Sequence, residues 1–290
     1  MSDLKVVVAG AGVIGLSLAY ELTHSPGVRV VLVDRDEPGQ ASSWAGAGIV
    51  TPAAPTAPRP IDRLRELSGR TLAAWSERLK AETGIDNEYI RCGGLELALE
   101  EEDLPGLERA AEDWREQGVA IEAVAAGRLR ELEPALAPGV AGAYLLPDEA
   151  QIRNPRHVAA LVAACAGRGV EVRTGTPVRG LAMKGDKDGG RVTGLVTDGG
   201  TIEGDAVVVA AGAWSAALLE TVGVSLPVRP VRGQIALLAP PAPLLSRVIW
   251  IGARYLVPRR DGRILVGSTE EEAGFTAHPT AEGVRGLLDL

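Results

Sequence analysis

The hydrophobic and polar positions at the start of the chain predict a strand, a glycine turn, a helix and a second strand. Residues 5–9 are wholly apolar after Lys5, as in a buried strand. Beyond the glycines, Ile14, Leu18 and Leu22 recur at helical spacing, and residues 28–33 form another mostly apolar run. This order is typical of a βαβ unit, which favours a parallel sheet and a right-handed crossover.

Later segments mix helical and strand patterns. Helices are expected at residues 63–83, 104–117 and 156–167, and strands at residues 89–99, 141–146, 170–172, 207–209, 228–238 and within 248–267. The last segment should turn at Asp261-Gly262, and another hairpin is expected near residues 186–190. Residues 51–60 contain four prolines without periodicity and are predicted to form a loop.

This alternation predicts an α/β chain of two interleaved domains. Residues 1–88 and 151–225 should form a Rossmann-type nucleotide-binding domain. Residues 89–150 and 226–290 should form a second, α+β domain on an antiparallel sheet.

A glycine motif lies between the first predicted strand and helix. Gly10, Gly12 and Gly15 form GxGxxG, in which the first permits the turn, the second lets backbone approach a pyrophosphate and the third lets helix and strand pack closely. The helix N-terminus at Val13 and Ile14 offers N–H groups to a phosphate. This context favours dinucleotide binding over a glycine-rich turn in an unrelated sheet.

An acidic residue follows at the distance expected for ribose binding. Asp34 ends the second strand, about 20 residues beyond the third glycine. A carboxylate there argues against NADP, although the adjacent Arg35 keeps that cofactor open. The motif alone does not separate FAD from NAD.

Composition excludes several classes of protein. Hydrophobic residues make up 46% and charged residues 23%, as in ordinary globular proteins, and the net charge of −8 with scattered arginines argues against nucleic acid as a partner. The sequence shows neither a signal peptide nor a run long enough for a membrane span, so a cytoplasmic location is expected.

The cysteines and histidines indicate no metal site. Cys92 and Cys165 are far apart in the sequence and are interpreted as ordinary thiols. His24, His157 and His278 are dispersed and read as surface or packing residues.

Residues 39–49 (GQASSWAGAGI) resemble the segment that glycine oxidases and related D-amino-acid and sarcosine oxidases place along FAD. The resemblance implies that a hydroxyl pair touches the pyrophosphate side and that small residues let backbone approach the isoalloxazine ring. The residues implied are Ser42, Ser43, Ala47, Gly48 and Ile49. A flexible linker is disfavoured because Trp44 and Ile49 add bulk.

Further matches to the same family extend over almost the whole chain. Val178 resembles a residue that presents backbone to adenine, and residues 207–214 resemble the strand and glycine turn that close over the dinucleotide. The turn residues implied are Ala211, Gly212 and Trp214. Residues 230–234 and 254–259 resemble segments of the substrate domain, where Tyr255 would lie beside the substrate. A strand tyrosine that only packs its ring is the alternative.

The family resemblance, which is strongest to the glycine oxidases of thiamine synthesis, implies an FAD-binding domain of the GR2 type joined to a substrate domain. It implies oxidation of a small amine or amino acid to an imine, reoxidation of the flavin by oxygen, and a homo-oligomer, with a tetramer suggested. In the family, a carboxylate-binding arginine and a final stretch of the FAD cradle follow the substrate-domain hairpin. We expect both to lie beyond Leu290.

Several functions remain open at this point. A D-amino-acid dehydrogenase would pass electrons to a quinone instead of oxygen. A NAD-dependent dehydrogenase would need only the glycine motif and Asp34. A truncated, inactive flavin-binding fragment is the non-enzymatic alternative.

Overall fold

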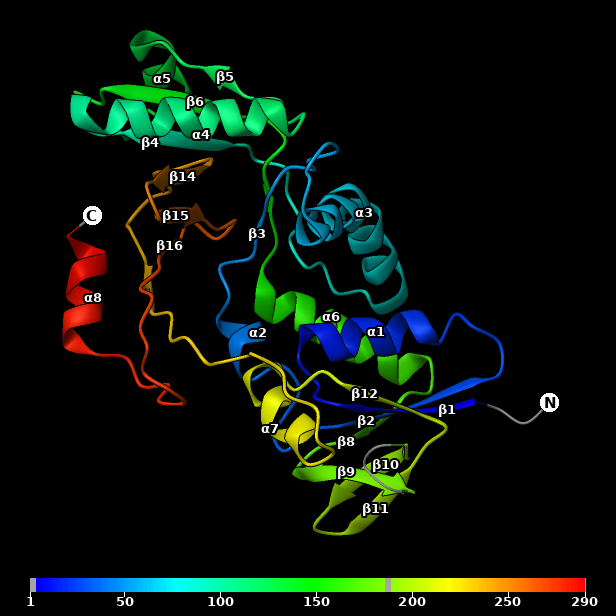
Figure 1. The fold of residues 1–290 in the computed structure, drawn as a ribbon. Helices are drawn as coiled ribbons and strands as arrows, with labels where there is room; N and C mark the ends of the chain where they lie inside the picture. Colours follow the sequence, from blue (N-terminus) through cyan, green and yellow to red (C-terminus); the bar gives the residue numbers. More distant parts are fainter. Residues whose placement is uncertain (1–3, 186–188, 290) are drawn as a thin grey trace. The chain divides into compact units, whose positions relative to one another are not determined.

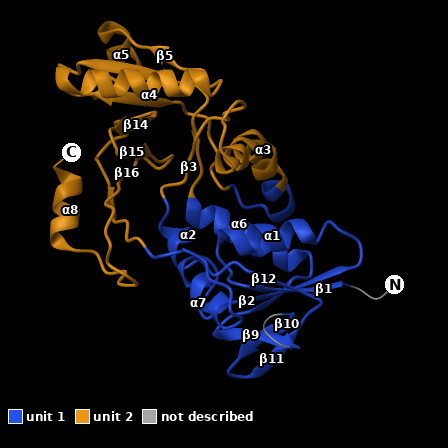
Figure 2. Ribbon diagram, viewed as in Figure 1, with its two compact units in different colours: residues 1–46, 79–86, 154–230 blue, residues 47–78, 87–153, 231–290 orange. Residues whose placement is uncertain are grey.

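The computed structural model describes residues 4–185 and 189–289, and the chain divides into two compact units (Figure 2). Unit 1 comprises residues 1–46, 79–86 and 154–230, and unit 2 comprises residues 47–78, 87–153 and 231–290. Each unit is therefore assembled from three separate stretches of chain.

A parallel sheet forms the centre of unit 1 (Figure 1). Its strands, in order, are β12 (Ala206–Val209), β1 (Leu4–Ala9), β2 (Val28–Val33) and β8 (Glu171–Arg173). All three pairings are parallel. Because both faces of such a sheet are covered, β1 and β2 end in four consecutive buried residues each.

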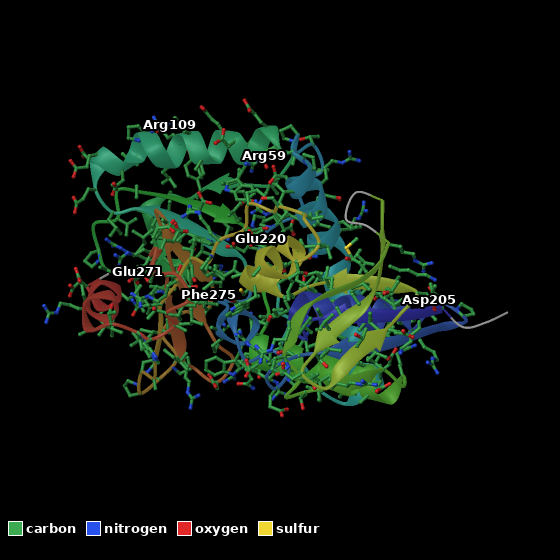
Figure 3. All side chains as sticks on the ribbon, turned by 60° about the horizontal axis from the view of Figure 1, so that its bottom comes forward. Arg59, Arg109, Asp205, Glu220, Glu271 and Phe275 are labelled. Atoms are coloured by element: carbon green, nitrogen blue, oxygen red, sulfur yellow. The ribbon has the colours of Figure 1, made fainter. Side chains whose placement is uncertain are left out.

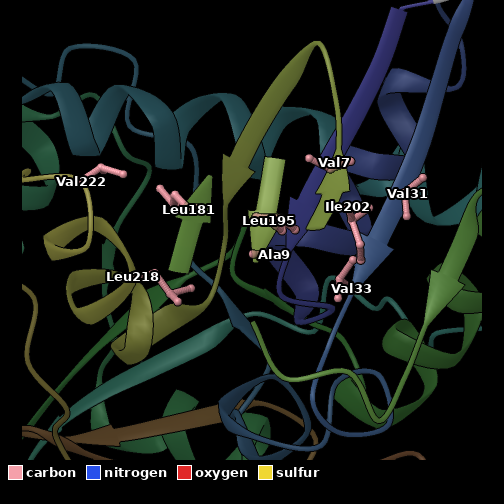
Figure 4. Close-up of a cluster of buried hydrophobic side chains, with 9 residues drawn as sticks. All are labelled: Val7, Ala9, Val31, Val33, Leu181, Leu195, Ile202, Leu218 and Val222. Atoms are coloured by element: carbon pink, nitrogen blue, oxygen red, sulfur yellow. The ribbon is translucent and has the colours of Figure 1, made fainter. Parts of the chain in front are cut away.

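Helices and a second sheet cover this parallel sheet. Helix α1 (Val13–Leu22) packs on β1 and β2 and against α6 (Asn154–Gly167). The antiparallel strands β9 (Val178–Lys184), β10 (Arg191–Thr197) and β11 (Gly200–Glu203) form the second sheet, whose leucines share a buried cluster with Val7, Val31 and Val33 (Figure 4). The hairpin expected near residues 186–190 falls partly on 186–188, which lie outside the described residues, although β9 and β10 on either side are paired.

The remaining elements of unit 1 are short. They are α2 (Ser42–Ala45), the 3-10 turn η2 (Gly212–Trp214) and α7 (Ser215–Glu220). Asp205, which is labelled in Figure 3, follows β11. Its carboxylate accepts a hydrogen bond from the Lys5 backbone N–H at 2.8 Å, which joins the start of β1 to the β11–β12 turn.

Unit 2 is built on a seven-stranded mixed sheet. Its strands, in order, are β13 (Ile235–Leu238), β16 (Ile264–Gly267), β15 (Arg254–Pro258), β14 (Val248–Ile251), β4 (Gly94–Ala98), β6 (Gly142–Leu146) and β5 (Glu122–Ala123). Only the β14–β4 pairing is parallel.

Helices and one small ribbon complete unit 2. The helices are α3 (Pro60–Thr83, its last residues in unit 1), η1 (Glu101–Asp103), α4 (Leu104–Glu116), α5 (Ala126–Leu132) and α8 (Ala281–Leu288). The ribbon pairs β3 (Ile49–Val50) with β7 (Ala150–Gln151). Among the described residues, none of these helices combines the length and apolarity that crossing a bilayer requires.

Three expectations differ from the structure. The sheet of unit 2, expected to be antiparallel, contains one parallel pairing, between β4 and β14. Residues 47–78 group with unit 2 instead of the nucleotide-binding part, because β3 pairs with β7 and because Ala54 and Ala57 pack beside Leu146. The strand expected at 228–238 is confined to β13, since Pro230 cannot donate to a ladder and residues 228–234 make only an isolated bridge at Arg232.

Candidate dinucleotide site

A pocket of about 800 Å³ opens in unit 1 where the parallel strands end. Ala9, Val33 and Val209, the last residues of β1, β2 and β12, line it. Ligands of α/β sheets bind outside the carboxyl ends of the strands, and this volume lies in the range of small-molecule and cofactor sites.

Most residues singled out in unit 1 lie in this pocket. The expected residues that line it are Gly10, Gly12, Val13, Ile14, Asp34, Arg35, Ser42, Ser43, Val178, Ala211, Gly212 and Trp214. Gly15 is buried beneath the turn.

The glycine turn is tight enough to exclude side chains. Gly10 has φ +109°, and a Cβ there would collide with the carbonyl of Ala210. A Cβ on Gly15 would collide with the Gly10 carbonyl, so α1 packs on the turn by backbone contact. The floor of the pocket is therefore bare backbone.

Ser43 meets the N-terminus of α1 at the pocket. Gly12 is the N-cap residue, and the Val13 N–H donates to Ser43 Oγ at 2.8 Å. A Cβ on Gly12 would lie 3.1 Å from the same Oγ, so this glycine leaves room for the hydroxyl. The structure thus joins the glycine motif to the SSWAGAGI segment through one hydrogen bond.

The Asp34 carboxylate is fixed at the end of β2. Its Oδ2 accepts from the Ala11 N–H at 2.6 Å and its Oδ1 from the Asp36 N–H at 3.0 Å. Each carboxylate oxygen has a second lone pair, so both can still accept from ribose hydroxyls.

An arginine stacks on an indole at the pocket wall. The Arg35 guanidinium carbon lies 3.9 Å from the Trp214 ring centroid, within the range of a cation–π contact. Arg35 also forms an exposed ion pair with Asp36 at 3.0 Å.

Sequence reasoning missed Asn154, which lines the same pocket from the first residue of α6. Its Nδ2 donates to the Ser43 carbonyl at 3.2 Å, whereas its Oδ1 is buried without a hydrogen-bond partner among the described residues. The signal was present, because Asn before Pro155 marks a helix start. A buried acceptor without a described partner, in a pocket that is also lined by glycine backbone and Asp34, fits a hydroxyl-rich ligand.

The other expected residues belong to unit 2 and do not line this pocket. Ala47, Ile49 and Tyr255 pack against one buried cluster made by Val248, Val257 and Leu265. Gly48 has φ +72°, and its carbonyl accepts from the Ile152 N–H at 2.8 Å.

Tyr255 packs its ring, as the alternative interpretation expected, and its contact with a substrate stays a prediction. Its ring packs against Trp250 with centroids 5.4 Å apart. Its hydroxyl, however, has no hydrogen-bond partner within residues 4–185 and 189–289.

A buried arginine anchors the segment before β3. Arg259 is 8% exposed, and its Nη2 donates to the Ala47 carbonyl at 2.6 Å. Its Nη1 donates to Gln151 Oε1 and to the Ile152 carbonyl, both at 2.9 Å. These described partners are all neutral, and burial lowers the pKa of the guanidinium. Arg259 therefore fixes the backbone at Ala47.

The fold and pocket define a dinucleotide-binding protein with a second unit on a mixed sheet. Residues 5–290 match the family described as FAD dependent oxidoreductase (DAO). The chain is 41% identical over 286 residues to a glycine oxidase of Pseudomonas aeruginosa, covering 98% of this chain and 76% of that protein. It is 34% identical over 290 residues to a bifunctional protein ThiO/ThiG of Synechocystis, covering 98% of this chain and 41% of that protein.

A solved structure agrees with these relatives. The crystal structure of glycine oxidase from Geobacillus kaustophilus superposes with a TM-score of 0.89 at 33% identity, covering 100% of this chain and 77% of that chain. The chain therefore belongs to the DAO family of FAD-dependent oxidoreductases, and its cofactor is FAD.

Proposed function

We propose that this chain uses FAD to oxidise glycine, or a similar small amine or amino acid, to its imine, with transfer of two electrons to oxygen and formation of hydrogen peroxide. The 41% identity to a glycine oxidase over nearly the whole chain is the observation that carries this proposal. The pocket of unit 1 supports it, since its glycine floor, acidic strand end and unpartnered Asn154 acceptor suit FAD.

We assign the pyrophosphate of FAD to the glycine turn and the N-terminus of α1. Gly10 and Gly12 leave the backbone bare there, and Ser42 and Ser43 add hydroxyls. We assign the ribose to Asp34 and the adenine end to Val178, Arg35 and the turn at Ala211, Gly212 and Trp214.

We assign the isoalloxazine side to Ala47, Gly48 and Ile49, and the substrate contact to Tyr255. When bound, FAD supplies the oxidation by taking a hydride from the substrate carbon. The chain's residues bind and orient: Arg259 fixes the Ala47 backbone, and the Tyr255 hydroxyl, which no described residue engages in a hydrogen bond, is assigned to a small substrate.

The likeness to bifunctional ThiO/ThiG proteins supports a place in thiamine synthesis. We propose that the imine supplies thiazole assembly, that the enzyme works in the cytoplasm and that it forms a homo-oligomer, with a tetramer as the specific form.

Peroxide production by the FAD-loaded protein tests the proposal. We expect glycine-dependent peroxide, with sarcosine and D-alanine as comparison substrates. Absence of peroxide with all three would overturn the oxidase assignment. Turnover with a dye acceptor but not with oxygen would instead indicate a quinone-linked dehydrogenase, and tight NADH binding without retained flavin would indicate a nicotinamide enzyme.

A further inference from the structure

A row of cross-strand neighbours crosses the seven-stranded sheet and includes Tyr255. Tyr255 on β15 lies opposite Trp250 on β14 and opposite Gly267 on β16. Trp250 in turn lies beside Glu96 on β4. Residues directly opposite one another share a face of the sheet, so Tyr255, Trp250 and Glu96 place their side chains on the same face.

The Tyr255 ring is held on two sides. Its ring meets the Trp250 indole nearly edge-on, with centroids 5.4 Å apart and planes at 72°. On the other side, a Cβ on Gly267 would lie 2.5–2.6 Å from the Tyr255 ring and hydroxyl, so the ring lies over bare backbone. The position of Tyr255 therefore depends on the position of the Trp250 indole.

The indole is fixed by a buried carboxyl. Trp250 Nε1 lies 3.0 Å from both Oε1 and Oε2 of Glu149 and donates to this group. Glu149 is 1% exposed, and its carboxyl occupies space that a Cβ on Gly94 would fill. Gly94 thus leaves space for the Glu149 carboxyl, and Gly267 leaves space for the Tyr255 ring.

The surroundings of Glu149 favour its neutral form. Burial raises its pKa to about 8, with a contribution from nearby Glu96, whose own pKa is also raised by burial. Burial raises the pKa of the Cys92 thiol, and the charge of Glu149 raises it further. No lysine or arginine pairs with Glu149 among the described residues. Glu96 has its own indole donor, Trp114 Nε1, at 2.8 Å.

We propose that Glu149, acting through Trp250, is a positioning residue for Tyr255. The carboxyl orients the indole, the indole and Gly267 orient the tyrosine ring, and the tyrosine hydroxyl is thereby set for the substrate. This inference rests on the proposed function of Tyr255.

The two Trp–Glu pairs provide a matched comparison. Trp250→Phe and Trp114→Phe each remove one indole donor to a carboxyl, which is buried in Glu149 and half-buried in Glu96. Among the described contacts, Trp250 and not Trp114 meets the Tyr255 ring. We expect Trp250→Phe to raise KM for glycine by about threefold to tenfold, as for one lost hydrogen bond, with kcat within about twofold. Trp114→Phe should leave KM unchanged, and thermal unfolding of both variants verifies that they are folded. Equal KM values in the two variants and the parent would overturn the proposal.

A spectroscopic titration tests the Glu149–Trp250 link without turnover. We expect near-ultraviolet tryptophan absorbance of the parent to titrate with a midpoint near the pKa of about 8. This transition should vanish in Glu149→Gln and in Trp250→Phe, and should move to lower pH in Glu96→Gln. Glu149→Gln should also keep the parent's KM at neutral pH, because the amide oxygen can still accept from Trp250.

The two tests separate the two claims. A titration that is unchanged in Glu149→Gln would overturn the Glu149–Trp250 link. Absence of turnover in every variant and the parent would overturn the proposed function and the role of Tyr255 with it, while the titration would still decide the link.

Discussion

Three glycines of one short turn each meet a different steric requirement. Gly10 has a backbone conformation that L side chains rarely adopt, Gly12 admits the Ser43 hydroxyl and Gly15 packs α1 on the carbonyl of Gly10. The motif is therefore required by the geometry of unit 1 itself.

Gly15→Ala should destabilise the protein, because the added methyl meets backbone that cannot rotate away. We expect a loss of about 1–3 kcal/mol in the free energy of unfolding, measured by urea denaturation. Gly167→Ala in α6 is the matched control, since nothing lies within 4 Å of its Cβ and alanine favours helix. A Gly15→Ala protein as stable as Gly167→Ala would contradict the packing described here.

Glu149→Gln should change the pH dependence of stability. The folded pKa of Glu149 is raised from 4.5 to about 8, so its contribution to stability is complete below the unfolded pKa and is lost as pH rises to the folded pKa. Between these two pKa values, the folded state retains a proton on Glu149 that the unfolded state has released. The stability of Glu149→Gln relative to the parent should therefore grow by about 1.4 kcal/mol per pH unit. Urea unfolding at both ends of this pH range measures this difference, and a constant difference would contradict the raised pKa.

Residues that follow a local rule were predictable, and residues that depend on distant segments were not. Gly10, Asp34 and Arg35 follow from the strand–turn–helix pattern and do line the pocket. Asn154 reaches the pocket because α6 packs against α1 and α2, and the buried Glu149 carboxyl occupies space beside Gly94. These contacts join residues far apart in the sequence, so the periodic pattern of hydrophobic residues does not predict them.

At the scale of elements, the N-terminus of α1 and the start of α2 act together. Ser43 accepts from Val13 N–H, and its own carbonyl accepts from Asn154, so three elements meet at one residue. Ser42, its neighbour, lines the pocket and makes no side-chain hydrogen bond among the described residues.

The two serines should therefore separate stability from cofactor affinity. Ser43→Ala should lower the free energy of unfolding of the FAD-free protein by about 0.5–1.5 kcal/mol, because the Val13 N–H loses its acceptor. Ser42→Ala should leave that value unchanged and weaken FAD binding by about threefold to tenfold, as for one lost hydrogen bond. Urea unfolding and FAD titration measure the two effects. Equal unfolding free energies for the two variants would contradict the capping role of Ser43.

The hydrophobic pattern located the long elements well. Strand β2 occupies the whole of residues 28–33, and α3, α4 and α6 lie close to their expected ranges. The shorter strands β3, β5 and β7 were missed because two residues give no period, and β13 was expected too long because apolar residues continue past Pro230 without forming a ladder.

At the scale of the whole molecule, the chain crosses between its two units several times. The sequence predicted this interleaving, since βαβ and antiparallel patterns alternate. It assigned residues 47–78 to the nucleotide-binding domain, whereas they group with unit 2 through the β3–β7 pairing and through small alanines that pack beside Leu146. Family resemblance supplied what patterns could not, namely FAD instead of NAD, and residues 5–290 match that family.

The central claim is that this chain holds FAD and reduces it with glycine. The most direct test is the visible absorption spectrum of the desalted protein, recorded before and after glycine is added without oxygen. We predict that flavin bands survive desalting and fade when glycine is added. Retained bands that stay unchanged with glycine, sarcosine and D-alanine would contradict the activity, and a desalted, FAD-supplemented protein that shows no flavin bands would contradict the cofactor site.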